Sequence, residues 1–190
     1  MGRKICCSYS KGENILKFQE LSLKGVFLIE LEKIEDERGF FARSWDKKEF
    51  ENNKLNSNLF QCNISFNKNK GTIRGMHFQK DPYAEAKTIR CTRGKVFEVM
   101  IDIRINSPTF HKWISVELDE KKCEILYVPE GFALGFQTLS ENTELFYQMS
   151  EYYHPEKSGG IKWDDPKIQI KWPLECSTIS KKDDSFKQLI

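Results

Sequence analysis

Three histidines occur in the 190-residue sequence, and one of them, His77, stands among residue types that suit proton transfer next to an anionic substrate. Arg74 precedes it by three residues and Lys87 follows it by ten. An imidazole titrates near neutral pH, so His77 could act as a general base. A fixed arginine and a lysine suit a diphosphate, and a lysine also suits the negative charge of an enolate. This segment is therefore the first candidate for a catalytic site.

Two residues elsewhere in the sequence could complete the proton transfer. Asp165 could orient an imidazole, and Tyr147, in an alternating segment, could donate a proton. Each candidate also has a structural interpretation. His77 could be a hydrogen-bonded structural histidine, Arg74 and Lys87 could belong to a solvated loop, Asp165 could be a turn residue before a proline, and Tyr147 could pack in a core. The residue types alone leave both interpretations open.

A metal centre is not expected. A metal-binding barrel of this kind needs about three converging His or carboxylate ligands, and the other two histidines, His111 and His154, stand next to turn signals. The six cysteines are scattered and include no Cys-x-x-Cys pair, which favours reduced thiols over a zinc site or a disulfide framework. We expect neither a metal nor a redox cofactor.

The composition gives no sign of nucleic acid or membrane as a partner. Thirty Lys and Arg residues against 28 Asp and Glu residues leave a net charge of +2, without a clustered basic patch. No stretch approaches the ~18 apolar residues of a membrane span. The N-terminus lacks the apolar run of a secretory signal. We therefore expect a cytoplasmic protein.

The elements that must position the candidate residues have the pattern of short β-strands. Several runs alternate apolar and polar residues, as half-buried strands do, and turn signals separate them. Many short strands at this spacing predict an all-β sandwich or barrel. The expected strands cover residues 26–29, 40–41, 64–66, 95–103, 113–118, 125–129 and 143–149.

Other segments depart from this pattern. Residues 46–53 lack Gly and Pro and are predicted to form a short helix. Residues 1–17 are polar and irregular and are interpreted as a loose N-terminal arm. Residues 18–190 are then a single domain, of a size that one core can support. Residues 174–190 are expected to pack on the outside of that domain.

The motifs, taken together and in order, resemble the dTDP-4-dehydrorhamnose 3,5-epimerase family. The resemblance runs from about Gly25 to Asp183 without a break in order, and the ordered set is far more specific than any one motif. The motifs that carry it are Asp36-Glu37-Arg38-Gly39-Phe40-Phe41, Gln61-Cys62-Asn63-Ile64-Ser65, Arg74-Gly75-Met76-His77-Phe78-Gln79, Lys87-Thr88-Ile89-Arg90, Asp102-Ile103-Arg104, Ser107-Pro108-Thr109, Val128-Pro129-Glu130-Gly131-Phe132-Ala133, residues 147–153 and Ile161-Lys162-Trp163-Asp164-Asp165-Pro166.

The resemblance implies a cupin-like jelly-roll β-barrel with a few short peripheral helices, which forms a homodimer by exchanging N-terminal strands. It also implies a cofactor-independent isomerase of deoxysugar biosynthesis, which removes and returns a proton beside the C4 ketone of a nucleotide-linked 4-keto-6-deoxy sugar. By resemblance, the catalytic residues would be the base His77, its partner Asp165, the acid Tyr147, and Lys87, which stabilises the enolate. The resemblance also assigns the binding residues: Arg38 and Arg74 would hold the diphosphate, Gln61 and Asn63 would line the site, and Tyr153 would stack on the nucleobase.

Three positions depart from the family pattern. Leu134 stands where the family has a histidine, Arg43 where it has an acidic residue, and Ser158 near a usual glutamate. These differences leave open the nucleotide, the sugar, and whether C3, C5 or both are inverted. The alternatives are a single-centre epimerase that uses a CDP- or GDP-linked sugar, and a non-catalytic sugar-nucleotide binder on the same fold.

Overall fold

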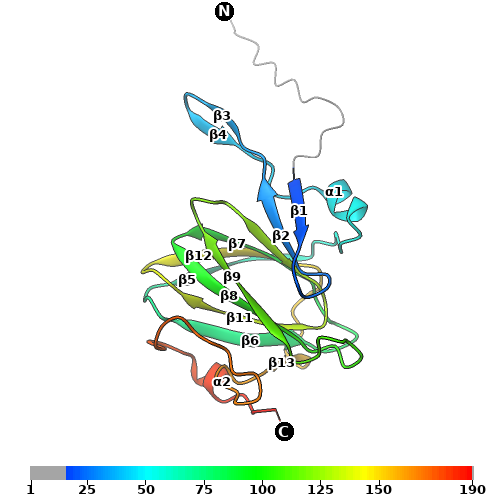
Figure 1. The fold of residues 1–190 in the computed structure, drawn as a ribbon, viewed down its shortest axis with the longest axis vertical. Coiled ribbons are helices and arrows are strands. Elements are labelled where there is room, and N and C mark those ends of the chain that lie inside the picture. The colour runs from blue at the N-terminus through cyan, green and yellow to red at the C-terminus, as the bar shows by residue number, and fades with distance from the viewer. Residues whose placement is uncertain (1–15, 190) are drawn as a thin grey trace, which may run out of the picture.

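The computed structural model describes residues 16–189, whose main elements are two antiparallel β-sheets that pack face to face (Figure 1). The six-stranded sheet has the order β1-β2-β10-β7-β12-β5, and the five-stranded sheet has the order β13-β6-β11-β8-β9. This architecture confirms the predicted all-β, cupin-like jelly roll. The strands of the first sheet are β1 (Leu16–Glu20), β2 (Phe27–Leu31), β10 (Ile125–Val128), β7 (Lys87–Arg93), β12 (Thr143–Met149) and β5 (Gln61–Asn67). Those of the second are β13 (Ser158–Gly160), β6 (Ile73–Gln79), β11 (Phe132–Thr138), β8 (Lys95–Asp102) and β9 (Trp113–Asp119).

The main core lies between the two sheets and follows from alternation along the strands. In β8, Val96 and Met100 point inward to one hydrophobic cluster, whereas Val99 and Ile101 join a second cluster on the outer face of the sheet. Side chains of a strand alternate between its two faces, so Glu98 is placed among the inward-facing residues. The inner cluster supports the candidate site, because Leu134, Phe136 and Tyr147 pack against it.

The predicted helix at residues 46–53 is confirmed as α1 (Lys47–Asn52). Asp46 caps its N-terminus by accepting hydrogen bonds from the amides of Lys48 and Glu49. Phe50 is fully buried, and its ring makes edge contacts with Phe18 and Tyr127. The helix therefore packs on the face of β1, β2 and β10 that points away from the five-stranded sheet.

The first described strand is β1, Leu16–Glu20, so Leu16 and Lys17 of the expected arm belong to a strand. Leu16 is buried, and its amide donates a hydrogen bond to the Glu49 carboxylate at 3.0 Å. This contact with α1 recruits a segment that looks polar in the sequence. The rest of the expected arm, residues 1–15, lies outside the described residues.

A two-stranded hairpin of β3 (Ile34–Asp36) and β4 (Gly39–Phe41) projects from the body of the domain (Figure 1). It exposes three large apolar side chains, Ile34, Phe40 and Phe41. Contiguous exposed apolar side chains are typical of an interaction surface.

The C-terminal segment covers the outer face of the five-stranded sheet. Ile168 is buried there, and Ile170, Trp172 and Leu189 pack against the same cluster. The segment also contains the short helix α2 (Lys181–Asp184), which contacts β6. The expectation that residues 174–190 only pack on the outside is therefore incomplete, because α2 reaches the candidate site. No helix within residues 16–189 is long and apolar enough to cross a lipid bilayer.

Candidate functional site

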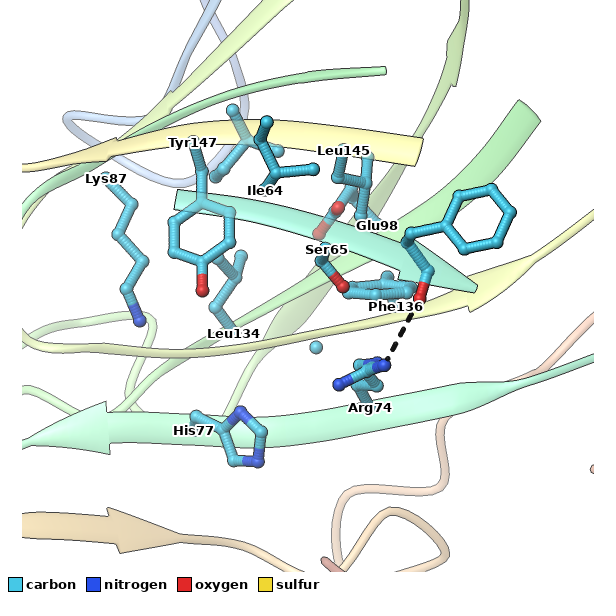
Figure 2. A pocket seen from close by; sticks show the side chains of 13 residues that line it. Ile64, Ser65, Arg74, His77, Lys87, Glu98, Leu134, Phe136, Leu145 and Tyr147 are labelled. Carbon is cyan, nitrogen blue, oxygen red and sulfur yellow. Dashed lines mark hydrogen bonds between the residues drawn. The ribbon is translucent and has the colours of Figure 1, made fainter. Parts of the chain in front are cut away.

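A cavity of about 390 Å³ opens between the two sheets, and both sheets supply its walls (Figure 2). We call it the Arg74 chamber, after a cationic residue that lines this cavity and not the second one described below. Its other walls are largely apolar, and the two sheets contribute acidic, basic and phenolic side chains to the same space. The chamber is lined by Ile64, Ser65, Phe66, Arg74, His77, Lys87, Ile89, Glu98, Leu134, Gly135, Phe136, Leu145 and Tyr147.

A second cavity, of about 420 Å³, shares three residues with the first: His77, Lys87 and Tyr147. We call it the Tyr153 chamber. Three predicted substrate-binding residues, Gln61, Asn63 and Tyr153, line it together with Ser158, Lys182 and others. Both cavities are in the size range of small-molecule sites. Three of the four predicted catalytic residues, His77, Lys87 and Tyr147, therefore lie where the two chambers meet.

A β-bulge in β6 turns both Arg74 and His77 into the cavity. Residues three apart on a regular strand face opposite sides, but here Leu134 pairs with His77 while Phe136 pairs with Arg74, so β6 has one residue more than β11. Gly75 occupies the bulge with φ +136°, and a Cβ there would lie 2.5 Å from the Gly135 backbone. Only glycine fits such a conformation and such a close approach.

His77 has a carboxylate partner, which is Asp183. Nε2 of His77 lies 2.8 Å from Oδ1 of Asp183, and the Asp183 side chain is buried. Asp183 lies within α2, whose N-cap Ser180 accepts a hydrogen bond from the Asp183 amide. The Gly75 amide also donates to Asp183 at 3.3 Å. The bulge and the C-terminal helix therefore fix one His–Asp pair.

The assignment of Asp165 as the partner of His77 is wrong. Asp165 is buried elsewhere and accepts hydrogen bonds from the amides of Lys167, Ile168 and Leu189. Its carboxylate ties the C-terminal segment to a turn, and it lines neither chamber. Its role in the structure is the stabilisation of backbone, which is the turn interpretation that the sequence left open.

The charge of Asp183 determines which nitrogen of His77 carries the proton. Burial opposes ionisation of Asp183, but the hydrogen bonds from His77 and Gly75 outweigh it and lower the pKa of this carboxyl below its usual value. An ionised carboxylate only accepts hydrogen bonds, so Nε2 of His77 must be the donor. In the neutral imidazole, Nδ1 then keeps its lone pair. The pair is built to present a base at Nδ1 and to stabilise the imidazolium that forms.

Tyr147 projects into the cavity from β12 of the six-stranded sheet, whereas His77 comes from β6 of the five-stranded sheet (Figure 2). Burial raises the pKa of Tyr147; Arg74 opposes this rise and Glu85 adds to it. The phenol therefore keeps its proton at neutral pH and can donate it. Base and acid stand on opposite walls of one site.

Lys87 lies between the two walls and is held by an acidic neighbour that the sequence did not single out. Its ammonium group is 2.6 Å from Oε1 of Glu85, whose side chain is buried. Glu85 lines the Tyr153 chamber together with Lys87. This ion pair fixes the position of the ammonium group at the junction of the chambers.

Arg38 is, with Asp165, a predicted site residue that does not line the cavity. It belongs to the turn of the β3–β4 hairpin, where it pairs with Asp36, and it lines neither chamber. Arg43 pairs with Asp46 at 2.9 Å next to α1 and is also outside both chambers. By contrast, Leu134 is on the wall of the Arg74 chamber, as its register with His77 requires.

Glu98 is a second acidic residue of the cavity that the sequence interpretation missed. It is 1 % exposed, and its Oε2 atom has no hydrogen-bond partner among the described residues. Burial raises the pKa of Glu98 to about 8, against the opposing effect of Lys87. Other ionisable groups near it or in its chamber are Cys91 on β7, Tyr147 on β12, and Arg74 and His77 on β6. Burial therefore favours the protonated carboxyl group of Glu98 over its carboxylate.

This raised pKa predicts a pH dependence of stability. Because the folded chain binds the Glu98 proton more tightly than the unfolded chain does, the free energy of unfolding falls as the pH rises from about 4.5 to about 8. Glu98→Gln removes this contribution, so its stability relative to the unaltered protein should increase across that window. Urea unfolding between pH 5 and 9 measures the difference, with Glu35→Gln as a control for the loss of one carboxyl. A difference that does not change with pH would contradict the buried, protonated state.

The chain is similar in sequence to proteins of one family. The sequence profile of the family described as dTDP-4-dehydrorhamnose 3,5-epimerase matches residues 20–190. A dTDP-4-dehydrorhamnose 3,5-epimerase of Sinorhizobium fredii is 44% identical over 169 residues, which cover 88% of this chain and 87% of the relative.

Solved structures of sugar-nucleotide epimerases share the fold of this chain. An epimerase of Legionella pneumophila in complex with dTDP-4-keto-L-rhamnose superimposes with a TM-score of 0.86 at 35% identity, covering 91% of this chain and 92% of the other. A 3′-monoepimerase of Streptomyces bikiniensis in complex with dTDP-quinovose has a TM-score of 0.82 at 27% identity, covering 88% and 85%.

Proposed function

Because the chain belongs to the dTDP-4-dehydrorhamnose 3,5-epimerase family, we propose that it is an isomerase that inverts carbon centres beside the ketone of a dTDP-linked 4-keto-6-deoxy sugar. The observation that carries the proposal is the His77–Asp183 pair on one wall of a cavity that has Tyr147 on the other. Inversion of a carbon centre needs a base on one face and an acid on the opposite face, and this geometry supplies both. The test is NMR identification of the product formed from dTDP-4-keto-6-deoxyglucose.

The residues have distinct roles in the proposed reaction. Nδ1 of His77 takes the proton from the carbon next to C4, and the electrons of the C–H bond pass to the ketone oxygen to give an enolate. Lys87 stabilises the enolate by its positive charge, and its own side chain is largely buried. Tyr147 gives a proton to the opposite face of the same carbon. Exchange with solvent then returns His77 and Tyr147 to their starting protonation states.

Replacement of Tyr147 by Phe should separate proton removal from inversion. The ring is kept, so the packing against the inner cluster survives, but the proton donor is lost. We expect formation of the inverted product to fall by about 10²–10⁴-fold, whereas His77 still exchanges the substrate proton for deuterium on its own face. NMR in deuterium oxide distinguishes deuterated substrate from deuterated product. Equal loss of exchange and product would show that Tyr147 positions the substrate instead.

Arg74 is proposed to bind the diphosphate, with Gln61 and Asn63 lining the site and Tyr153 stacked on the nucleobase. The Arg74 guanidinium is already held by Asn67 Oδ1 at 2.7 Å, which supports a fixed anion contact. Arg74→Ala should weaken dTDP binding by about 10- to 100-fold. Calorimetric titration with dTDP measures this effect, and Arg93→Ala, at the far end of β7, is the control. Unchanged affinity in Arg74→Ala would exclude this diphosphate contact.

A homodimer would bring Arg38 to the cavity. The hairpin that holds Arg38 projects from its own domain and exposes Ile34, Phe40 and Phe41, which supports burial of this hairpin against a second copy (Figure 1). Such an exchange of N-terminal strands would give Arg38 access to the partner's diphosphate.

The four described cysteines, Cys62, Cys91, Cys123 and Cys176, are free thiols, which supports the proposed cytoplasmic location.

A single-centre epimerase is the second candidate function, and one observation favours it. Leu134 lines the chamber and pairs with His77 across the sheet. The family pattern has a histidine at this position, so this chamber offers the sugar one polar side chain fewer. Leu134→His should then raise deuterium incorporation at the slower of C3 and C5. If both positions already exchange equally well in the unaltered enzyme, Leu134 does not limit its scope.

A further inference from the structure

The Arg74 chamber contains an acidic group that the proposed proton transfer does not use. Glu98 lies on β8 between the inward-facing Val96 and Met100, and it lines the chamber. In the view of Figure 2, Glu98 and Lys87 lie on either side of Tyr147, and the positive charge of Lys87 still acts on the Glu98 carboxyl group. The position of Glu98 is therefore different from that of the group proposed to stabilise the enolate.

The surroundings of Glu98 leave one of its oxygens without a partner. Among the residues that line the chamber, Ile89, Leu134, Phe136 and Leu145 offer no side-chain hydrogen bond, and the hydroxyl-bearing Ser65 and Tyr147 do not bond to Oε2 of Glu98. Within residues 16–189, Oε2 of Glu98 is buried and has no hydrogen-bond partner. A buried polar atom of this kind costs free energy unless something bonds to it. The unbonded Oε2 atom therefore costs free energy in the protein without ligand, and a hydrogen bond from a ligand in the chamber would remove this cost.

The register of the sheet explains why no side chain satisfies this oxygen. Glu98 pairs with Phe136 on β11, and the next inward-facing pair along the same strands is Met100 with Leu134. All three neighbours are apolar, so β8 and β11 form a floor on which Glu98 is the polar side chain, whereas Arg74 and His77 enter the chamber from β6 of the same sheet. A ligand that matches this floor must combine apolar carbon with an oxygen-bearing group.

We propose that Glu98 determines substrate specificity by forming a hydrogen bond with a hydroxyl group of the bound sugar in the Arg74 chamber. A hydroxyl both donates and accepts, and a neutral carboxyl group does the same, so the two groups match. A 6-deoxy sugar also offers a methyl group and ring carbons to the apolar floor. The inference rests on the proposed function for the identity of the ligand, but not on which carbon is inverted.

Binding of a non-reacting ligand tests this contact directly. The sugar nucleotide dTDP-6-deoxyglucose has no ketone, so its dissociation constant can be measured without turnover. The full set of ligands is dTDP-6-deoxyglucose, its versions that lack the C2, C3 or C4 hydroxyl, and dTDP alone. Glu98→Leu removes the hydrogen bond, Glu98→Gln keeps a donor and an acceptor, and Met100→Leu is a matched control at the next inward-facing position of β8.

We expect Glu98→Leu to weaken binding of dTDP-6-deoxyglucose by about 10- to 100-fold, with Glu98→Gln and Met100→Leu close to the unaltered protein. One deoxy ligand should show no such loss, because it already lacks the bonded hydroxyl. dTDP alone should bind all variants equally.

Three results would overturn the proposal. These are an unchanged affinity in Glu98→Leu, an equal loss for every deoxy ligand, and an equal loss for dTDP, which would assign the contact to the nucleotide. Solvent exchange on dTDP-4-keto-6-deoxyglucose by the unaltered protein tests the epimerase function separately. If that exchange occurs while Glu98→Leu binds normally, the inference about Glu98 fails and the function stands. If exchange is absent, the function fails, and the binding series still decides whether Glu98 contacts a sugar.

Discussion

His77→Ala is expected to lower solvent exchange of the sugar protons by at least about 10²–10⁴-fold, the usual contribution of a general base. The loss should be this large because the described cavity offers no second imidazole: of the other histidines, His111 stacks on Phe110 and His154 on Tyr83, outside both chambers. His77→Asn should have the same effect, since an amide cannot take the proton. Deuterium uptake into dTDP-4-keto-6-deoxyglucose measures the loss.

A control distinguishes chemistry from folding. His77 is partly exposed at the cavity wall, so the variant should still fold and bind dTDP, with a lower thermal unfolding temperature because the buried Asp183 carboxylate loses a hydrogen bond. His111→Asn removes a histidine at a position with φ +61°, a conformation that asparagine tolerates, and should retain full exchange. Near-normal exchange in His77→Ala would assign the base to another residue.

Asp183→Asn is expected to have the second largest effect, although Asp183 touches no substrate in this scheme. An asparagine amide can donate to Nε2 of His77, which would move the imidazole proton to Nδ1 and remove the lone pair that faces the cavity. By analogy with other His–carboxylate pairs, we expect exchange to fall by about 10²–10⁴-fold. The dependence of the exchange rate on pH should also change, because the variant lacks the carboxylate that stabilises the imidazolium.

Asp165→Asn is the matched comparison, since both aspartates are buried and both bind backbone amides. Asp165 ties down the amides of Lys167, Ile168 and Leu189, so its replacement should lower the free energy of unfolding by about 1–3 kcal/mol. The exchange rate of the folded enzyme should stay close to normal. The reverse pattern, with activity lost in Asp165→Asn and kept in Asp183→Asn, would restore the assignment made from the sequence.

The contrast between the two aspartates shows where sequence reasoning fails. Asp165 stands in a recognisable Trp163-Asp164-Asp165-Pro166 motif, whereas Asp183 is 106 residues from His77 in a four-residue helix. Nothing in local periodicity brings α2 back to β6, because that contact depends on how the C-terminal segment crosses the outer face of the sheet. The signal that was available is Ser180, an N-cap type three residues before Asp183.

Strands with strong alternation were predicted, whereas β6, β7 and β11 at the site were missed, as were the short strands β1, β3 and β13. β8, β9 and β12 follow the alternating pattern, and their existence was predicted from it. β6 and β11 contain Gly75 and Gly135, which meet at the bulge, and β7 is rich in Lys, Arg and Thr. These strands carry His77, Lys87 and Leu134, so the departures from regular strand pattern coincide with the site.

Glu98 illustrates a signal that the sequence did contain. The expected strand at residues 95–103 places Val96, Glu98 and Met100 on one face, and an acidic residue between two apolar ones on an inward face is unusual. Arg38 could not be located in the same way. Its proposed site belongs to a second chain, so no pattern within one sequence gives its distance from His77.

The most direct test of proton transfer beside the ketone is incubation of the unaltered protein with dTDP-4-keto-6-deoxyglucose in deuterium oxide, followed by NMR of the sugar. The predicted result is deuterium at C3 and C5 in an inverted product. Deuterium at C3 alone, or at C5 alone, would identify the single-centre epimerase. If neither carbon gains deuterium while dTDP still binds, His77 does not act as a base in this cavity, and the protein is a sugar-nucleotide binder rather than an epimerase.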